Sequence, residues 1–167
     1  MSRVVLVGMP GVGKTTIGRA VANRLGCGFL DLDEMLADTI GVSAADFLRE
    51  NGEEAFRIAE SSALRVALQS DAVVSCGGGT VTYGPSRNLL HNHHCVIWLT
   101  APLGVLEKRV HGGDRPLLGD DATTALAGLY DVRGPLYREV ATTQVDTDRD
   151  LDDVVREIVE YVGKLSA

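Results

Sequence analysis

A short glycine-rich run near the start of the chain, Gly8–Thr15, reads Gly-Met-Pro-Gly-Val-Gly-Lys-Thr. It matches G-x-x-x-x-G-K-[ST] in full and lies between an apolar segment and a helical pattern, which is the context that this motif requires. Its glycines let backbone N–H groups turn inward as an anion-binding nest at a helix N-terminus. The run therefore predicts a loop that binds a nucleoside triphosphate, with Lys14 reaching the β- and γ-phosphates and the Thr15 hydroxyl available to Mg²⁺.

Short apolar segments alternate with helical patterns along the rest of the chain. Strands are expected at 3–7, 29–32, 72–76, 95–100 and 143–146, and helices at 14–25, 34–39, 44–50, 53–69, 86–90, 102–110, 123–137 and, after the last strand, up to about 165. This alternation predicts an α/β fold with a five-stranded parallel sheet covered by helices on both faces. The 167 residues correspond to one domain, and its ligands are expected beyond the carboxyl ends of the strands.

Composition narrows the class of partner. The net charge of −7 argues against a nucleic-acid partner, and no run of 18 apolar residues is present to span a membrane. Cys27, Cys76 and Cys95 are odd in number and lie among apolar residues, so we expect buried free thiols and a cytoplasmic protein.

Two carboxylates, Asp31 and Asp33, follow the second expected strand. Residues two apart in extended chain point to the same face, so both side chains would face the phosphate loop. One could hold the metal, and the other could accept a proton from a hydroxyl nucleophile. In the alternative interpretation, Asp33 only caps a helix that begins at Glu34.

Two arginines and a glycine run are candidates for binding the second substrate. Gly77–Gly79 follow the third expected strand and would expose bare backbone N–H groups, although a loose turn is the simpler explanation. Arg57 has Glu53 and Glu60 at helical spacing, which also fits a solvated ion-pair face. Together with Arg133, it would supply two planar forks for a carboxylate. Spacing alone does not establish that the two arginines converge.

The segment 111–121 is rich in glycine and aspartate and shows no periodicity, which is typical of a mobile lid. Arg115 within it could stabilise charge on the transferring phosphoryl group, as arginines do in other phosphoryl transferases.

The ordered set of motifs resembles the shikimate kinase family over roughly residues 4–161. Beyond the phosphate loop, the resemblance rests on Phe29–Asp33, on Gly52–Arg57 followed by Glu60, and on three later motifs. These are Gly77–Gly79, Arg115–Leu118 and Arg133–Tyr137.

The resemblance implies a P-loop kinase fold of three layers with strand order 2-3-1-4-5, substrate-binding helices at about 33–60 and a lid at about 111–121. It implies transfer of the γ-phosphoryl group of ATP to the 3-hydroxyl of shikimate, with Mg²⁺, in a protein that is expected to be a monomer. The implied catalytic residues are Asp33 as base, Lys14 and Arg115. Shikimate would contact Asp33, Arg57, Gly77, Gly78, Gly79 and Arg133. ATP would contact Gly11, Val12, Gly13, Lys14, Thr15, Thr16 and Arg115, and Mg²⁺ would bind at Thr15 and Asp31.

The residues that contact adenine are harder to assign. Family members often carry a basic residue and a proline after the last strand, where this chain reads Asp146–Asp152 without a proline. Arg149 in that segment and Arg109 before the lid are the two candidates.

Two other functions remain open from the sequence. A related kinase of gluconate or a nucleoside monophosphate would share the phosphate loop, but the paired arginines and the triple glycine favour a carboxylated, polyhydroxy substrate. A nucleotide-gated switch would need neither Asp33 nor the arginine pair, and the N-K-x-D stretch typical of guanine-reading switches is absent from the sequence.

Overall fold

A computed structural model of the chain describes residues 3–111 and 122–167. Five parallel strands in these residues form a sheet in the order β2-β3-β1-β4-β5, as expected. The strands are β1 (Val4–Val7), β2 (Gly28–Asp31), β3 (Ala72–Ser75), β4 (Val96–Thr100) and β5 (Thr143–Asp146). The central strand β1 is buried at every position, because helices cover both sides of the sheet and leave no polar face.

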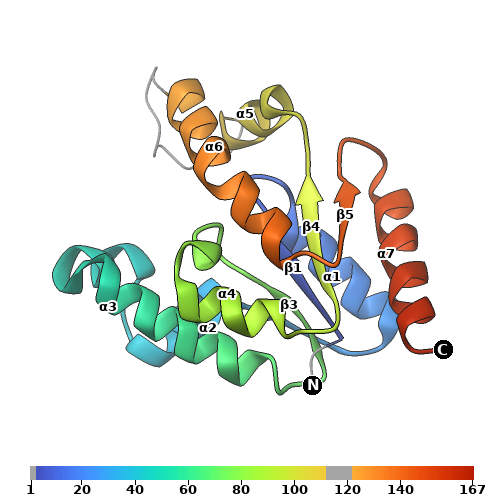
Figure 1. The fold of residues 1–167 in the computed structure, drawn as a ribbon, viewed down its shortest axis with the longest axis horizontal. Coiled ribbons are helices and arrows are strands. Elements are labelled where there is room, and N and C mark those ends of the chain that lie inside the picture. Colours follow the sequence, from blue (N-terminus) through green and yellow to red (C-terminus); the bar gives the residue numbers. More distant parts are fainter. Residues whose placement is uncertain (1–2, 112–121) are drawn as a thin grey trace.

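Helices cover the sheet in two layers (Figure 1). The helical elements are α1 (Lys14–Leu25), α2 (Leu32–Ile40), α3 (Ala44–Ala67), the 3₁₀ turn η1 (Thr80–Thr82), α4 (Gly84–His91), α5 (Leu103–His111), α6 (Ala122–Val140) and α7 (Leu151–Leu165). Helices α1 and α7 pack together on one face, and α4 and α6 pack on the other, with α3 beside α4. None of the helices in the described residues has the length and apolar character that crossing a membrane requires.

The helices expected at 44–50 and 53–69 form a single element, α3, with a break at Gly52. Its φ of 84° and ψ of 169° are non-helical and lie in a region that only glycine adopts readily. The helix expected at 123–137 continues to Val140 although Pro135 lies inside it. Tyr137 and Val140 beyond the proline are both buried, so tertiary packing outweighs the local cost of the proline.

The cysteines differ from expectation at one position. All three are free thiols, and Cys76 and Cys95 are buried, but Cys27, directly before the edge strand β2, is partly exposed.

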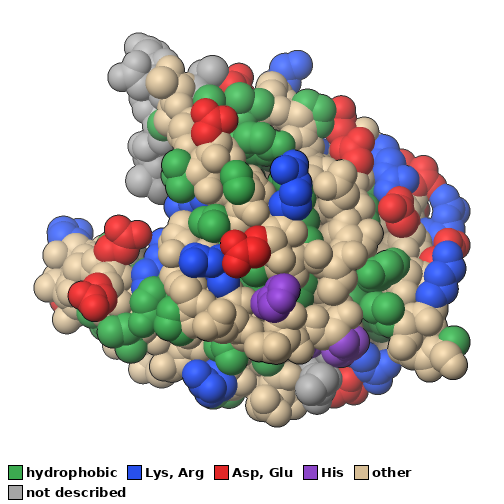
Figure 2. Space-filling view, in the orientation of Figure 1, with side chains coloured by type: hydrophobic (Ala, Val, Ile, Leu, Met, Phe, Trp, Pro, Cys, Tyr) green, Lys and Arg blue, Asp and Glu red, His purple; other side chains and the backbone are tan. Residues whose placement is uncertain are grey.

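On the face shown in Figure 2, acidic and basic side chains are interspersed, most densely along α7. The carboxyl ends of β1, β2 and β3 lie at the same end of the sheet, where the phosphate loop, Asp31 and the glycine run follow them.

Candidate active site

The phosphate-loop motif connects β1 to α1 as the sequence predicts. Gly13 precedes α1 with a φ of 100°, a left-handed conformation that favours glycine and turns the chain into the helix. Lys14 Nζ donates to the carbonyl oxygens of Gly8 at 2.8 Å and Met9 at 3.0 Å. The ammonium group therefore lies folded back over its own loop.

Burial lowers the pKa of Lys14 to about 8, and nearby Cys76, Asp33 and Asp31 oppose this shift. Arg133 adds to it, so two acidic groups and a second cation lie close enough to Lys14 to affect its titration. These interactions place the predicted metal, base and clamp residues around the phosphate loop.

Asp31 ends β2 and makes two kinds of hydrogen bond. Its Oδ2 accepts from Thr15 Oγ1 at 2.9 Å, and its Oδ1 accepts from the backbone N–H of Asp33 at 3.0 Å. Asp31 is thus the N-cap of α2, which begins at Leu32. The alternative in which Asp33 caps a helix beginning at Glu34 is therefore wrong. The argument that both carboxylates face one side of an extended strand is also wrong, because the chain is already helical at Asp33.

Asp33 nevertheless reaches the glycine run, from the first turn of α2. A Cβ atom added at Gly77 would lie 2.9 Å from Asp33 Oδ1 and 3.0 Å from Glu60 Oε1. A side chain at position 77 would collide with both carboxylates, so only glycine lets Asp33 approach β3 this closely.

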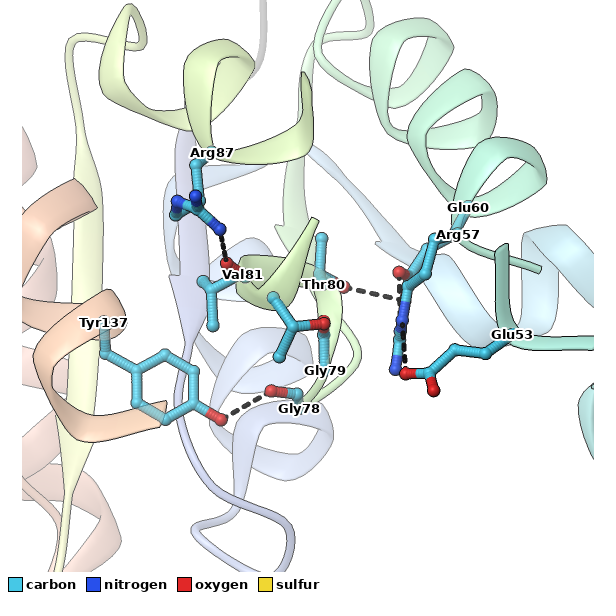
Figure 3. Close-up of polar contacts among 10 residues, drawn as sticks. Glu53, Arg57, Glu60, Gly78, Gly79, Thr80, Val81, Arg87 and Tyr137 are labelled. Atoms are coloured by element: carbon cyan, nitrogen blue, oxygen red, sulfur yellow. Dashed lines mark hydrogen bonds and ion pairs between the residues drawn. The ribbon is translucent and has the colours of Figure 1, made fainter. Parts of the chain in front are cut away.

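Arg57 lies beside the glycine run, on the side opposite Tyr137 (Figure 3). Its Nη1 lies 2.8 Å from Glu60 Oε2, and the side chains of the two residues are only 14% and 2% exposed. The ion pair is therefore buried, and the solvated ion-pair face considered from the sequence is wrong. Glu60 Oε1 in turn accepts from Thr80 Oγ1 at 2.8 Å. The Arg57 Nε atom is buried and has no hydrogen-bond partner in the described residues, with Glu53 Oε1 at 3.7 Å.

Both arginines approach the glycine run, which spacing could not establish. A Cβ atom added at Gly79 would lie 2.2 Å from Arg57 Nη2, and one at Gly78 would lie 3.2 Å from Arg133 Nη1. Arg57 lies on α3, and Arg133 lies on α6. Two guanidinium groups from different helices therefore meet neighbouring glycines, an arrangement suited to one planar anion.

Thr15 and Asp31 fit the predicted metal site. Their oxygen atoms lie 2.9 Å apart beside the phosphate loop, and Mg²⁺ prefers carboxylate, hydroxyl and phosphate oxygens.

Of the two candidates for contacting adenine, Arg109 is the one with a hydrogen bond to the phosphate loop. Its guanidinium donates to Val12 O at 3.3 Å, Thr147 Oγ1 at 3.1 Å and Thr147 O at 3.0 Å, joining the phosphate loop to the segment after β5. Arg149 donates to Asp146 O at 3.0 Å and pairs with Glu157 on α7. The predicted lid and Arg115 lie outside the described residues, apart from His111.

From the sequence, Thr80 and Tyr137 had no predicted role, and Glu60 was considered only as part of a solvated ion pair. In the structure all three support the glycine run or Arg57. The Tyr137 hydroxyl donates to Gly78 O at 2.6 Å (Figure 3). In the sequence, only helical spacing indicates these contacts: Glu60 follows Arg57 by three residues, and Tyr137 follows Arg133 by four.

Known proteins resemble this chain in sequence and in fold. The family model described as shikimate kinase matches residues 10–163. The shikimate kinase of Frankia casuarinae is 41% identical over 98% of this chain and 74% of its own length. A structure of shikimate kinase from Acinetobacter baumannii in complex with shikimate is 33% identical, with a TM-score of 0.88 over 96% of this chain and 92% of its own. A gluconokinase from Sinorhizobium meliloti, at 23% identity and a TM-score of 0.62 over 97% of this chain and 92% of its own, shares the fold alone.

Proposed function

The chain belongs to the shikimate kinase family, and from that premise we propose how its residues act in the reaction. It is an ATP-dependent kinase that phosphorylates shikimate in aromatic biosynthesis. The observation that carries the assignment of roles is the approach of Arg57 and Arg133 to adjacent glycines, on the same edge of the sheet as Asp33 and Lys14.

In our proposal, the shikimate carboxylate binds between Arg57 and Arg133 against the backbone of Gly77–Gly79. The 3-hydroxyl then lies toward Asp33, which accepts its proton as the oxygen attacks the γ-phosphorus of ATP. The bond from the γ-phosphorus to the oxygen shared with the β-phosphate breaks at the same time, and ADP leaves. Clamping one end of the ring while the phosphate loop holds ATP makes the reaction effectively intramolecular, and such positioning acts together with electrostatic stabilisation in phosphoryl transfer.

The nucleotide site is proposed from the phosphate loop. The phosphates bind the N–H groups of Gly11, Val12, Gly13, Lys14, Thr15 and Thr16. Lys14 exchanges its two carbonyl partners for phosphate oxygens. Thr15 and Asp31 would hold Mg²⁺, which would neutralise phosphate charge there. Arg109 is the preferred contact for adenine over Arg149, because its contacts reach the phosphate loop. Arg115, in a lid at 111–121, would stabilise the transferring group.

We further propose that residues 1–167 act as one kinase domain, with substrate-binding helices at 33–60, and that the protein works as a monomer in the cytoplasm. Size-exclusion chromatography with light scattering tests the monomer directly.

The reaction is tested by following ADP release from Mg–ATP with shikimate, with no acceptor and with quinate. We expect shikimate-dependent ADP release, little release without an acceptor, and a product whose phosphorus NMR coupling identifies the 3-position. ATP binding without any stimulation by shikimate would remove the substrate assignment and the roles of Asp33, Arg57 and Arg133. A phosphate on another hydroxyl would remove only the proposed orientation.

A further inference from the structure

The three carbonyl groups of the glycine run are all occupied by hydrogen bonds. Gly77 O accepts from Thr80 N at 3.1 Å, and Gly79 O accepts from Thr82 N at 2.9 Å and Thr82 Oγ1 at 2.7 Å. The hydrogen bonds to these two carbonyls are local to the turn that leads into η1. The middle carbonyl, of Gly78, is held instead by the Tyr137 hydroxyl on α6 at 2.6 Å.

Holding this carbonyl also orients the next N–H group. The peptide between Gly78 and Gly79 is planar and trans, so its C=O and N–H point in opposite directions. In Figure 3, Tyr137 and Arg57 approach this peptide from opposite sides. With the carbonyl directed to Tyr137, the N–H of Gly79 is directed to the side of Arg57. The hydrogen bonds among the described residues do not use this N–H, which leaves it available to an anion.

Tyr137 is well placed to fix this orientation. Its side chain is 0% exposed, and its ring packs against Trp98 of β4 with centroids 6.0 Å apart. Burial raises its pKa to about 12, so the hydroxyl remains a donor at all physiological pH values. Tyr137 follows Arg133 by one helical turn on the same face of α6. One helix face thus presents Arg133 and the Tyr137 hydroxyl to Gly78 together.

We propose that Tyr137 is a positioning residue for the carboxylate of shikimate: it holds the Gly78–Gly79 peptide so that the N–H of Gly79 faces the anion between Arg57 and Arg133. This inference rests on the proposed role of the two arginines. Without the phenol, the peptide can rotate and present its carbonyl oxygen to the anion, which repels it.

The test is Tyr137→Phe, which keeps the ring and removes only the hydroxyl. We expect the KM for shikimate to rise about tenfold, which is the usual range for one lost hydrogen bond in a buried site. The KM for ATP and kcat should stay within about twofold of wild type, on the same hydrogen-bond reasoning. Tyr161→Phe, the same change on α7 beside β5, is the matched control and should leave all three constants unchanged.

A shikimate analogue with a hydroxymethyl group in place of the carboxylate separates positioning from general loss of structure. Its kcat/KM should be the same for wild type and Tyr137→Phe, because the anion that needs the oriented peptide is gone. An equal loss for shikimate and the analogue, or an unchanged shikimate KM, would overturn the proposal. If the variant folds poorly, glycine-¹⁵N spectra of the wild type decide instead: shikimate, and not the analogue, should shift the Gly79 amide.

Arg57→Lys and Arg133→Lys separate the proposed arginine clamp from the positioning role of Tyr137. If neither raises the shikimate KM, the clamp itself is wrong and the inference falls with it. If both raise it while Tyr137→Phe does not, the clamp stands and only the positioning role of Tyr137 is lost.

Discussion

Arg57 and Glu60 form a 2.8 Å ion pair from which water is almost excluded, since the Glu60 side chain is 2% exposed. One carboxylate oxygen holds the arginine and the other holds Thr80, so the guanidinium is fixed before any substrate arrives. In the proposed clamp, Glu60 therefore links substrate binding to the stability of the fold.

Arg57→Ala should weaken both shikimate binding and the stability of the fold. The substitution leaves the Glu60 carboxylate buried without its cation, which typically costs about 3–5 kcal/mol of unfolding free energy. Arg133→Ala should weaken shikimate binding as strongly with a smaller loss of stability, because Arg133 has no buried acidic partner of this kind among the described residues. Urea unfolding and shikimate titration calorimetry measure the two effects. Equal stability of both variants would contradict the coupling, and an unchanged shikimate Kd would remove that arginine from the clamp.

Asp33→Asn should lower kcat while ATP binding survives. A positioned general base typically contributes about 10²–10⁴-fold, and the amide cannot accept the proton. Steady-state turnover with a fluorescent-nucleotide displacement assay checks both parts. Equal kcat for wild type and variant would end the assignment of Asp33 as the base.

Gly79→Ala should damage shikimate binding through a steric effect alone. The φ of Gly79 is −93°, which any residue adopts, but the new methyl group would lie 2.2 Å from Arg57 Nη2. Displacing the guanidinium should raise the shikimate Kd by about tenfold or more, as losing a charge-assisted hydrogen bond does.

Gly163→Ala on α7 is the matched control, because a Cβ atom there meets nothing within 4 Å. It should leave binding unchanged and add roughly 0.5–1 kcal/mol of stability through its helix propensity. An unchanged shikimate Kd in Gly79→Ala would show that Arg57 can move without loss.

Asp31→Asn separates the two hydrogen-bonding roles of this residue. Asparagine caps a helix about as well as aspartate, so α2 and thermal stability should be preserved. The lost negative charge should raise the Mg²⁺ concentration for half-maximal activity by about 10–100-fold, the range seen when metal sites lose a supporting group. Activity measured over a Mg²⁺ titration at saturating ATP is the test. The same half-maximal concentration in variant and wild type would place the metal elsewhere.

ATP affinity should fall above about pH 8, because the pKa of Lys14 in the free protein is lowered to about 8. Phosphate oxygens favour the charged ammonium and raise that pKa on binding, so binding takes up a proton above pH 8 and weakens as pH rises. The expected rise in Kd is about fivefold between pH 8 and pH 9. Calorimetry in buffers of different ionisation enthalpy detects the proton uptake directly. Lys14→Arg, which does not titrate there, should show no such slope, and a flat wild-type profile would contradict the prediction.

Much of the fold follows from local patterns in the sequence. The apolar segments and helical periodicity predicted all five strands and the sheet class, and the motifs, through the resemblance, gave the strand order. The phosphate loop was identified from its own residues, because its glycines and Lys14 act within one short stretch of backbone. Local patterns were least reliable at element ends, which packing helps to decide. They started the second helix at Glu34, whereas α2 begins at Leu32, and they ended the helix before the last strand at Tyr137, whereas α6 continues to Val140.

The proposed substrate clamp could be recognised only from the tertiary structure. Arg57 and Arg133 lie on different helices, and their approach to Gly78 and Gly79 depends on how α3 and α6 pack beside the sheet. The burial of Glu60 and the bond from Tyr137 to Gly78 depend on the same packing. Sequence determines which chemical groups follow each strand, because strand and turn preferences are local. Which of those groups meet is decided by the core, since close packing admits few arrangements of side chains from distant segments.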